Sequence, residues 1–213
     1  AVVANPPYIT PKDAAANAAY RDRFETCHRS YSLAVPFMEL IFKLARRGAA
    51  DRSAGFTGQI TANSFMKREF GKKLIEEFLA DAVDLTHVVD TSGAYIPGHG
   101  TPTVILFGRN RSPVGDSLRA VMGIRGEPSS PDVPAEGLVW SSIEQLIDRA
   151  GTENDYISVD NVERARLNTH PWSLQGGGAD EAKSVVESTS VAELAAVCEL
   201  IGDTGRTSAD DSL

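Results

Sequence analysis

The sequence predicts an α/β fold: the second half of a doubly wound sheet, followed by a mixed α/β extension. Short apolar runs alternate with segments whose apolar residues recur at helical spacing. Two of these runs follow one another with no helix between them, so we expect the last two strands to be antiparallel. The chain also starts inside an apolar run, Ala1 to Ala4, which resembles the end of a strand and suggests that an N-terminal portion is missing.

The N-terminal elements are a long loop and a helix. Residues 9–32 are polar and mixed, which predicts a loop with a short helix over about 13–22. A loop of this length favours function or disorder over plain connection, and we expect it to be mobile and to contact substrate. Residues 33–47 carry apolar side chains at helical spacing, with Pro36 suited to the first turn and Gly48 to the stop.

The central elements alternate between strand and helix. Residues 55–60 predict a strand and residues 65–79 a helix, and residues 83–90 alternate well enough for another strand. Residues 103–107 are almost wholly apolar, which predicts a strand buried on both faces. The segment 91–102 between these strands is rich in Gly and Pro and is too long for a tight hairpin.

The last third predicts fewer regular elements. We expect a strand over 114–124, a helix over 141–149, and an irregular stretch over 150–178 in which Trp172 anchors a small core. Two helices, over 179–187 and 191–200, complete the prediction. We therefore divide the chain into residues 1–112, which hold the half sheet, and residues 113–213, the extension.

Composition limits the classes of protein. With 213 residues and 42% hydrophobic residues, the chain can bury one sizeable core. No apolar run approaches the roughly 20 residues that a membrane span needs, and no signal peptide is visible. A net charge of −8 argues against a stand-alone nucleic-acid binder, whose affinity comes mainly from neutralised phosphates. It does not exclude an enzyme that meets DNA with one face.

Cysteine usage predicts a reducing, cytoplasmic environment. Cys27 and Cys198 are far apart and share no metal-binding spacing. His28 follows Cys27 directly, but no second pair accompanies it. We therefore predict no metal site.

The most informative motif is Asn5-Pro6-Pro7-Tyr8, directly after the first apolar run. The side-chain oxygen of Asn5 and the carbonyl of Pro6 form a pair of acceptors for the two hydrogens of an amino group. Such a pair draws an amide-like or aromatic amine toward sp3 character and directs its lone pair. The two prolines stiffen the loop, and Tyr8 offers a flat face on which an extruded base can stack.

The same four residues allow two other interpretations. The motif is also a rigid turn after a strand, but its position after an apolar run favours function, because catalytic loops in open α/β sheets follow the carboxyl ends of strands. A WW-domain ligand needs a residue between the second proline and the tyrosine, which is absent here.

The motif and its order among the predicted elements resemble γ-type adenine-N6 DNA methyltransferases, which have a Rossmann-like sheet and use S-adenosylmethionine. Within that family the chain looks closest to the PglX-type methyltransferases of BREX phage-defence systems. The stretches that carry this likeness are Asn5–Thr10, Gln59–Gly71, Asp90–Thr103, Gly123–Pro128 and His170–Gly178. Together the likeness covers residues 1 to about 205.

The resemblance implies roles for individual residues. Asn5 and the Pro6 carbonyl would hold the target amine, Pro7 would shape the loop, and Tyr8 would stack on the flipped adenine. The long loop 92–102 would border the base pocket, with Tyr95 or His99 in contact with the base or the DNA backbone. A solvated connection explains this loop equally well. A solvated helix face is the favoured explanation of four basic residues, and contact with DNA phosphates is the alternative: Lys67, Arg68, Lys72 and Lys73.

The sequence departs from the family in its cofactor site. No Gly-any-Gly-any-any-Gly occurs in the 213 residues, so S-adenosylmethionine is expected to bind only in the complete protein. The isolated chain is then expected not to methylate. Half a sheet with an open edge is also expected to be poorly stable or to associate.

Two rival functions remain open at this point. A glutamine-N5 methyltransferase of translation release factors uses the same four residues on an amide, although such chains usually end soon after the last strand. A non-catalytic DNA-binding or scaffold module is the other. The favoured partners are double-stranded DNA and other phage-defence proteins, with no membrane.

Overall fold

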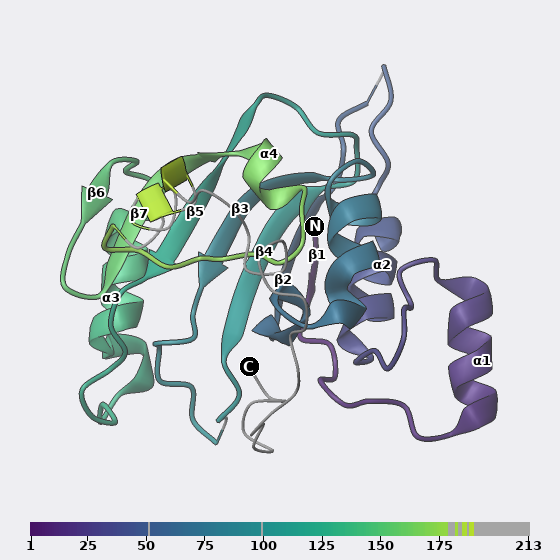
Figure 1. Cartoon of the computed structure of the whole chain (residues 1–213), viewed down its shortest axis with the longest axis horizontal. Helices are drawn as coiled ribbons and strands as arrows, with labels where there is room; N and C mark the ends of the chain where they lie inside the picture. The colour runs from purple at the N-terminus through teal and green to yellow at the C-terminus, as the bar shows by residue number, and fades with distance from the viewer. Residues whose placement is uncertain (51, 99, 179–181, 183–184, 187, 190–213) are drawn as a thin grey trace. The chain divides into compact units, whose positions relative to one another are not determined.

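The computed structural model of the protein describes all residues except 51, 99, 179–181, 183–184, 187 and 190–213 (Figure 1). The chain divides into two units, residues 1–177 and 178–213, of which the first contains the sheet. The strands are β1 (Val2–Ala4), β2 (Phe56–Ala62), β3 (Asp84–Asp90), β4 (Thr103–Arg109), β5 (Ser117–Gly123), β6 (Thr152–Glu153) and β7 (Ile157–Glu163).

The helices lie between and beside these strands. The α-helices are α1 (Ala14–Arg23), α2 (Ala34–Leu44), α3 (Leu138–Leu146) and α4 (Arg164–Leu167). The shorter turns are the 3₁₀ segments η1 (Asn63–Met66), η2 (Glu69–Gly71) and η4 (Pro134–Glu136) and the π-helix η3 (Leu74–Leu79). No helix in the described part of the chain is long and apolar enough to cross a membrane.

The seven strands of the described residues form one mixed sheet in the order β1-β2-β4-β3-β5-β7-β6. β1 is parallel to β2 and β3 is parallel to β5, whereas β4 is antiparallel to both β2 and β3. Parallel neighbours need a crossover, and α2 supplies it between β1 and β2. The α/β class and the antiparallel pairing of the strands around residues 83–90 and 103–107 are confirmed.

Each face of the sheet has its own core. Val88 packs in the larger cluster with Met38 of α2 and Leu74 of η3, while its neighbour Val89 packs in a second cluster with Ile143 of α3. Successive side chains of a strand point to opposite faces, so α2 and η3 cover one face and α3 covers the other. Figure 1 shows α2 beside β1 and β2, and α3 beside β5 and β7.

Coverage of the α3 face is incomplete near β1. Val3, Phe56 and Phe107 are 82%, 57% and 37% exposed, and they line an apolar hollow of about 380 Å³ that reaches Ile147 beyond α3. The prediction that residues 103–107 are buried on both faces is therefore wrong at Phe107. β1, which borders this hollow, is also the end strand of the sheet.

The predicted helix over residues 65–79 is wrong in its first part. The chain forms η1 and η2 there and becomes helical only in η3. A Cβ at Gly71 would lie 1.8 Å from the carbonyl oxygen of Phe65, so the backbone folds back on itself at this glycine. Because Phe65 and Phe70 are both buried by these turns, the apolar spacing is satisfied without a regular helix.

The prediction of an irregular stretch over 150–178 is also wrong, because β6, β7 and α4 lie within it. In β7, apolar Ile157 and Val159 alternate with polar Ser158 and Asp160, a strand pattern that the prediction did not use. Trp172 is an anchor as predicted, but it belongs to the larger core, where its ring meets Phe65 at 5.7 Å and 70°.

Two expectations are not decided by this structure. The helix predicted over 191–200, and most of that over 179–187, lie outside the described residues. The functional division at residues 112 and 113 stays a prediction; β5, which follows it, pairs with β3, which precedes it.

A buried charge cluster ties β3 to the segments after β4 and β7. The carboxylate of Asp84 is buried and accepts hydrogen bonds from Arg111 at 2.9 Å and Arg164 at 2.6 Å. The backbone N–H of Val114 donates to the same carboxylate at 3.3 Å. A buried carboxylate is tolerated when it is paired and hydrogen-bonded, as here.

Asp84→Ala is expected to lower the free energy of unfolding by about 3–5 kcal/mol, because it leaves the mostly buried Arg164 without its carboxylate. Urea denaturation measures this loss. The control is Asp81→Ala, three residues away and exposed, which should change stability by no more than about 0.5 kcal/mol. Equal effects of the two substitutions would contradict the assigned role of the cluster.

Candidate active site at the carboxyl end of β1

The loops that carry the predicted site residues lie at one edge of the sheet. Because β1, β2, β3 and β5 all run in the same direction, their carboxyl ends lie along this edge. The loops that follow Ala4, Ala62, Asp90 and Gly123 therefore border a common region. Ligands of open α/β sheets bind outside the carboxyl ends of strands, so this edge is where a substrate site is expected.

The motif Asn5 to Tyr8 begins where β1 stops. Pro6 is buried, which anchors the turn, while Asn5 and Pro7 are exposed and Tyr8 is half-buried. The hydroxyl of Tyr8 donates to Oδ1 of Asn5 at 2.7 Å and also lies 3.4 Å from the carbonyl oxygen of Ile60 in β2. Burial raises the pKa of the Tyr8 phenol above its usual value, so it remains a hydrogen-bond donor at neutral pH.

The long loop after the motif is a hydrogen-bonded unit. The N–H of Leu33 donates to the carbonyl of Ile9 at 2.8 Å and so closes the loop at its base. The predicted short helix is confirmed as α1, and its N-cap Asp13 accepts from the N–H of Ala16. At the end of the loop, Thr26 donates to the buried carboxylate of Glu39 in α2 at 2.8 Å.

Cys27 belongs to this loop and shows no sign of reactivity. Its side chain is buried, and burial raises the pKa of the thiol to about 11. The neighbouring Tyr31 has a pKa raised to about 12 by burial, and its hydroxyl donates to Asn17 at 2.8 Å. A thiol with so high a pKa is not a nucleophile at neutral pH. Among the described residues, no group of three or more metal-binding side chains was found.

Lys67 and Arg68 are exposed on the loop that joins η1 to η2, directly after β2. The segment around Trp172 braces this loop: the N–H of Trp172 donates to the carbonyl of Met66 at 2.8 Å, and the ring of His170 lies 3.1 Å from the carbonyl of Arg68. The basic side chains are thus held at the same edge as Asn5.

The other basic candidates nearby are Lys72, which is exposed, and Lys73, which lies 3.9 Å from Glu77. Such an exposed pair contributes little to stability and leaves the lysine available to other partners.

Tyr95 is half-buried in the loop after β3, which is tied down at several points. The hydroxyls of Thr91 and Thr103 are 2.7 Å apart, and the N–H of Glu127 donates to the carbonyl of Gly93 at 2.9 Å. Tyr95 therefore lies near the predicted edge, on an anchored loop. His99 lies outside the described residues, so its predicted role stays a prediction.

Asp90 was not singled out in the sequence, although it ends β3 at this edge. Its carboxylate accepts from the N–H of Ser92 at 2.8 Å, and a Cβ at Gly123 would lie 2.7 Å from its second oxygen. Burial raises the pKa of the Asp90 carboxyl above its usual value of 3.8. Its position as an acidic residue at the end of a predicted strand is the sequence signal that indicates Asp90 as a candidate.

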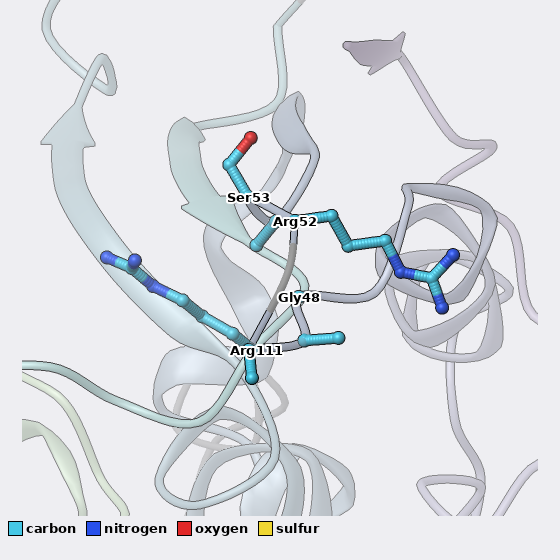
Figure 2. Close-up of a pocket in the computed structure, with 7 residues that line it drawn as sticks. Gly48, Arg52, Ser53 and Arg111 are labelled. Carbon is cyan, nitrogen blue, oxygen red and sulfur yellow. The ribbon is translucent and has the colours of Figure 1, made fainter.

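A second hollow, of about 570 Å³, lies at the opposite end of the sheet, before β2 and after β4. Figure 2 shows that the side chains of Arg52 and Arg111, which line it, extend in opposite directions. Arg111 is in addition 2.8 Å from the carboxylate of Asp84. The two guanidinium groups do not converge, so this hollow does not form an anion site.

Comparison with known proteins shows which proteins this chain is similar to. Residues 1–96 match the family described as Eco57I restriction-modification methylase. Over its whole length the chain is 49% identical to the adenine-specific methyltransferase PglX of Streptomyces coelicolor. The chain is therefore similar over its whole length to an adenine-specific methyltransferase. The resemblance predicted from Asn5 to Tyr8 and the stretches around it is confirmed.

The match has a limited extent. The chain covers 18% of the length of the Streptomyces protein, so it corresponds to one part of a much larger relative. The activity of that whole protein is carried over to this chain only as a proposal.

Solved structures confirm the fold. A modification subunit of a putative type I restriction enzyme from Vibrio vulnificus superposes with a TM-score of 0.58 at 13% identity, covering 86% of this chain and 39% of that one. The type IIG restriction endonuclease BpuSI superposes with a TM-score of 0.56 at 14% identity, covering 88% and 22%. The fold is thus the Rossmann-like methyltransferase fold that the sequence predicts.

Asp90 gives the protein a pH-dependent stability. A carboxyl whose pKa is raised by folding binds its proton more readily in the folded state than in the unfolded state. The free energy of unfolding therefore falls as the pH rises from about 4 through the raised pKa. Asp90→Asn cannot titrate, so it should remove this decline, and urea denaturation between about pH 4 and pH 7 measures it.

Asp160→Asn, at an exposed carboxylate on β7, is the matched control and should keep the decline. If Asp90→Asn and the wild type lose stability in parallel over this range, the assignment to Asp90 is wrong.

Proposed function

We propose that this chain is the target-binding half of a site-specific DNA adenine-N6 methyltransferase that acts in phage defence or restriction-modification. The observation that carries the proposal is the placement of Asn5 and Pro6 at the carboxyl end of β1, with Asn5 exposed and the turn anchored by Pro6. The identity of 49% to an adenine-specific methyltransferase supports the choice of adenine.

The chemistry follows from the acceptors. The exocyclic amine of adenine is a poor nucleophile because its lone pair is delocalised into the ring. Asn5 Oδ1 and the Pro6 carbonyl would accept its two hydrogens, which localises and aims the lone pair. Donors or acceptors fixed in a site before the substrate arrives need no reorganisation during the reaction, which is why they accelerate it.

The target base must leave the duplex to reach these acceptors. Enzymes that modify a base flip it into a pocket and stack it on an aromatic or apolar group, and Tyr8 is the aromatic residue next to Asn5. Stacking of a base on an aromatic ring is worth about 1–3 kcal/mol. Tyr95, on the anchored loop after β3, would border the same pocket.

S-adenosylmethionine is the methyl donor that the family implies, and the residues present do not form its site. The sequence has no Gly-any-Gly-any-any-Gly, and β1 is the end strand of the sheet. We infer that the cofactor binds to parts of the complete protein outside these 213 residues. The isolated chain is then inactive, and the complete protein would work in the cytoplasm, where DNA and cofactor occur together.

Double-stranded DNA is the proposed partner, contacted at one edge only. Lys67 and Arg68 are exposed on the loop after β2, at the same edge of the sheet as Asn5, and suit phosphate contacts despite the net charge of −8. Other phage-defence proteins are further proposed partners, on the strength of the relative alone.

The rival functions are less well supported. A glutamine-N5 methyltransferase would use the same acceptors on an amide, but the relative matched over the whole chain is adenine-specific. A scaffold without catalysis would not require an exposed asparagine at this position.

Asn5→Ala in the full-length parent protein should abolish adenine methylation, because the amine loses one of its two acceptors. The parent and the variant are expressed in a host without adenine methylation, and single-molecule sequencing maps N6-methyladenine. A motif modified by the parent and unmodified with Asn5→Ala is the expected result. Unmodified DNA with both proteins would overturn the DNA proposal and favour a protein amide substrate.

Lys67→Ala combined with Arg68→Ala should weaken DNA binding by the parent protein and lower the slope of log affinity against log salt by about 2. Each side chain is expected to release about one counterion from the phosphates. Fluorescence anisotropy between about 50 and 200 mM salt measures the slope. Arg47→Ala, exposed at the opposite end of β2, is the control and should leave it unchanged.

A further inference from the structure

We propose that the hydroxyl of Tyr8 occupies the acceptor atom of Asn5 until the target amine displaces it. This inference rests on the proposed function, because it assigns the incoming donor to an adenine amine. It adds a second role for Tyr8 that its aromatic ring alone cannot perform.

The starting observation is a single hydrogen bond. The Tyr8 hydroxyl donates to Asn5 Oδ1 at 2.7 Å, the usual distance for a bond between a hydroxyl and an oxygen acceptor. This is the oxygen that would accept from the target amine. Without a base, the acceptor is therefore satisfied by the chain itself.

A second acceptor lies within reach of the same hydroxyl. The carbonyl oxygen of Ile60 is 3.4 Å from Tyr8 Oη, which is close enough for a hydrogen bond but longer and weaker than the bond to Asn5. Tyr8 is half-buried and packs against the larger core, which limits its movement to small changes. The displaced hydroxyl thus keeps only this weaker partner, so part of its bond energy with Asn5 is lost in the exchange.

The exchange has a consequence for binding. Only a base that carries a hydrogen-bond donor can replace the hydroxyl on Asn5, so part of the energy of the new bond is used to break the old one. A net hydrogen bond between neutral groups is worth about 0.5–1.5 kcal/mol, which corresponds to a change of about two- to tenfold in affinity. Removal of the hydroxyl should therefore raise the affinity for DNA whose target base carries an amine by this two- to tenfold factor.

Tyr8→Phe tests the exchange because it keeps the ring and removes the donor. The full-length parent protein is titrated, with S-adenosylhomocysteine present to prevent turnover, against duplexes of the motif that sequencing reports. One duplex has adenine at the target position, and the other has purine, which lacks the amine. Tyr8→Phe should bind the adenine duplex about two- to tenfold more tightly than wild type and the purine duplex with unchanged affinity.

Equal changes for the two duplexes, or no gain for adenine, would overturn the inference. A variant with 4-fluorophenylalanine at position 8 keeps the size of the ring and its substituent but donates no hydrogen bond, and it should show the same gain. Urea denaturation of each variant establishes that the fold is retained. If Tyr8→Phe does not fold, the fluorinated variant decides between the two results.

A steady-state measurement separates the exchange from a purely structural role. Loss of the competing hydroxyl should lower KM for the adenine duplex, whereas a hydroxyl that only orients Asn5 would leave KM unchanged and lower kcat. The second pattern contradicts the inference. If the parent protein methylates no DNA at all, the proposed function fails and the inference fails with it; methylation without an adenine-specific gain in Tyr8→Phe defeats only the inference.

Discussion

The short parallel pairing of β1 with β2 determines where the candidate site lies. Three residue pairs make up this ladder, and the last of them joins Ala4 to Gln59. Asn5 follows at once, so the position of its side chain depends on three residues of an end strand. α2 packs on both strands and the buried Pro6 closes the turn, and these contacts compensate for the small number of ladder bonds. A loss of register in β1 would move the acceptor pair away from the edge where the loops after β2 and β3 meet.

Much of this arrangement follows from local patterns in the sequence. The strands around 55–60, 83–90 and 103–107 and the helix around 33–47 are where the apolar spacing places them. Each of these segments packs against a buried core, so its apolar spacing can be recognised in the sequence. The motif Asn5 to Tyr8 could be recognised for a different reason, because its chemistry depends on four residue types in direct succession.

The rest depends on tertiary contacts that no local pattern records. The turn at Gly71 exists because the backbone there meets the carbonyl of Phe65, a contact that helical spacing does not reveal. The place of β7 between β5 and β6 depends on antiparallel pairing with both strands, which its short alternation of apolar and polar residues does not reveal. The hydrogen bond between Tyr8 and Asn5 likewise depends on the conformation of the turn, so the sequence predicted both residues but not their contact.

The central claim is geometric: Asn5 and Pro6 hold the amine of a flipped adenine. A structure of the full-length parent protein with its duplex and S-adenosylhomocysteine tests it directly. The account predicts the target N6 within about 3 Å of both Asn5 Oδ1 and the Pro6 carbonyl, with the base stacked on Tyr8. A flipped base held by other residues, with Asn5 still bonded to Tyr8, would contradict it.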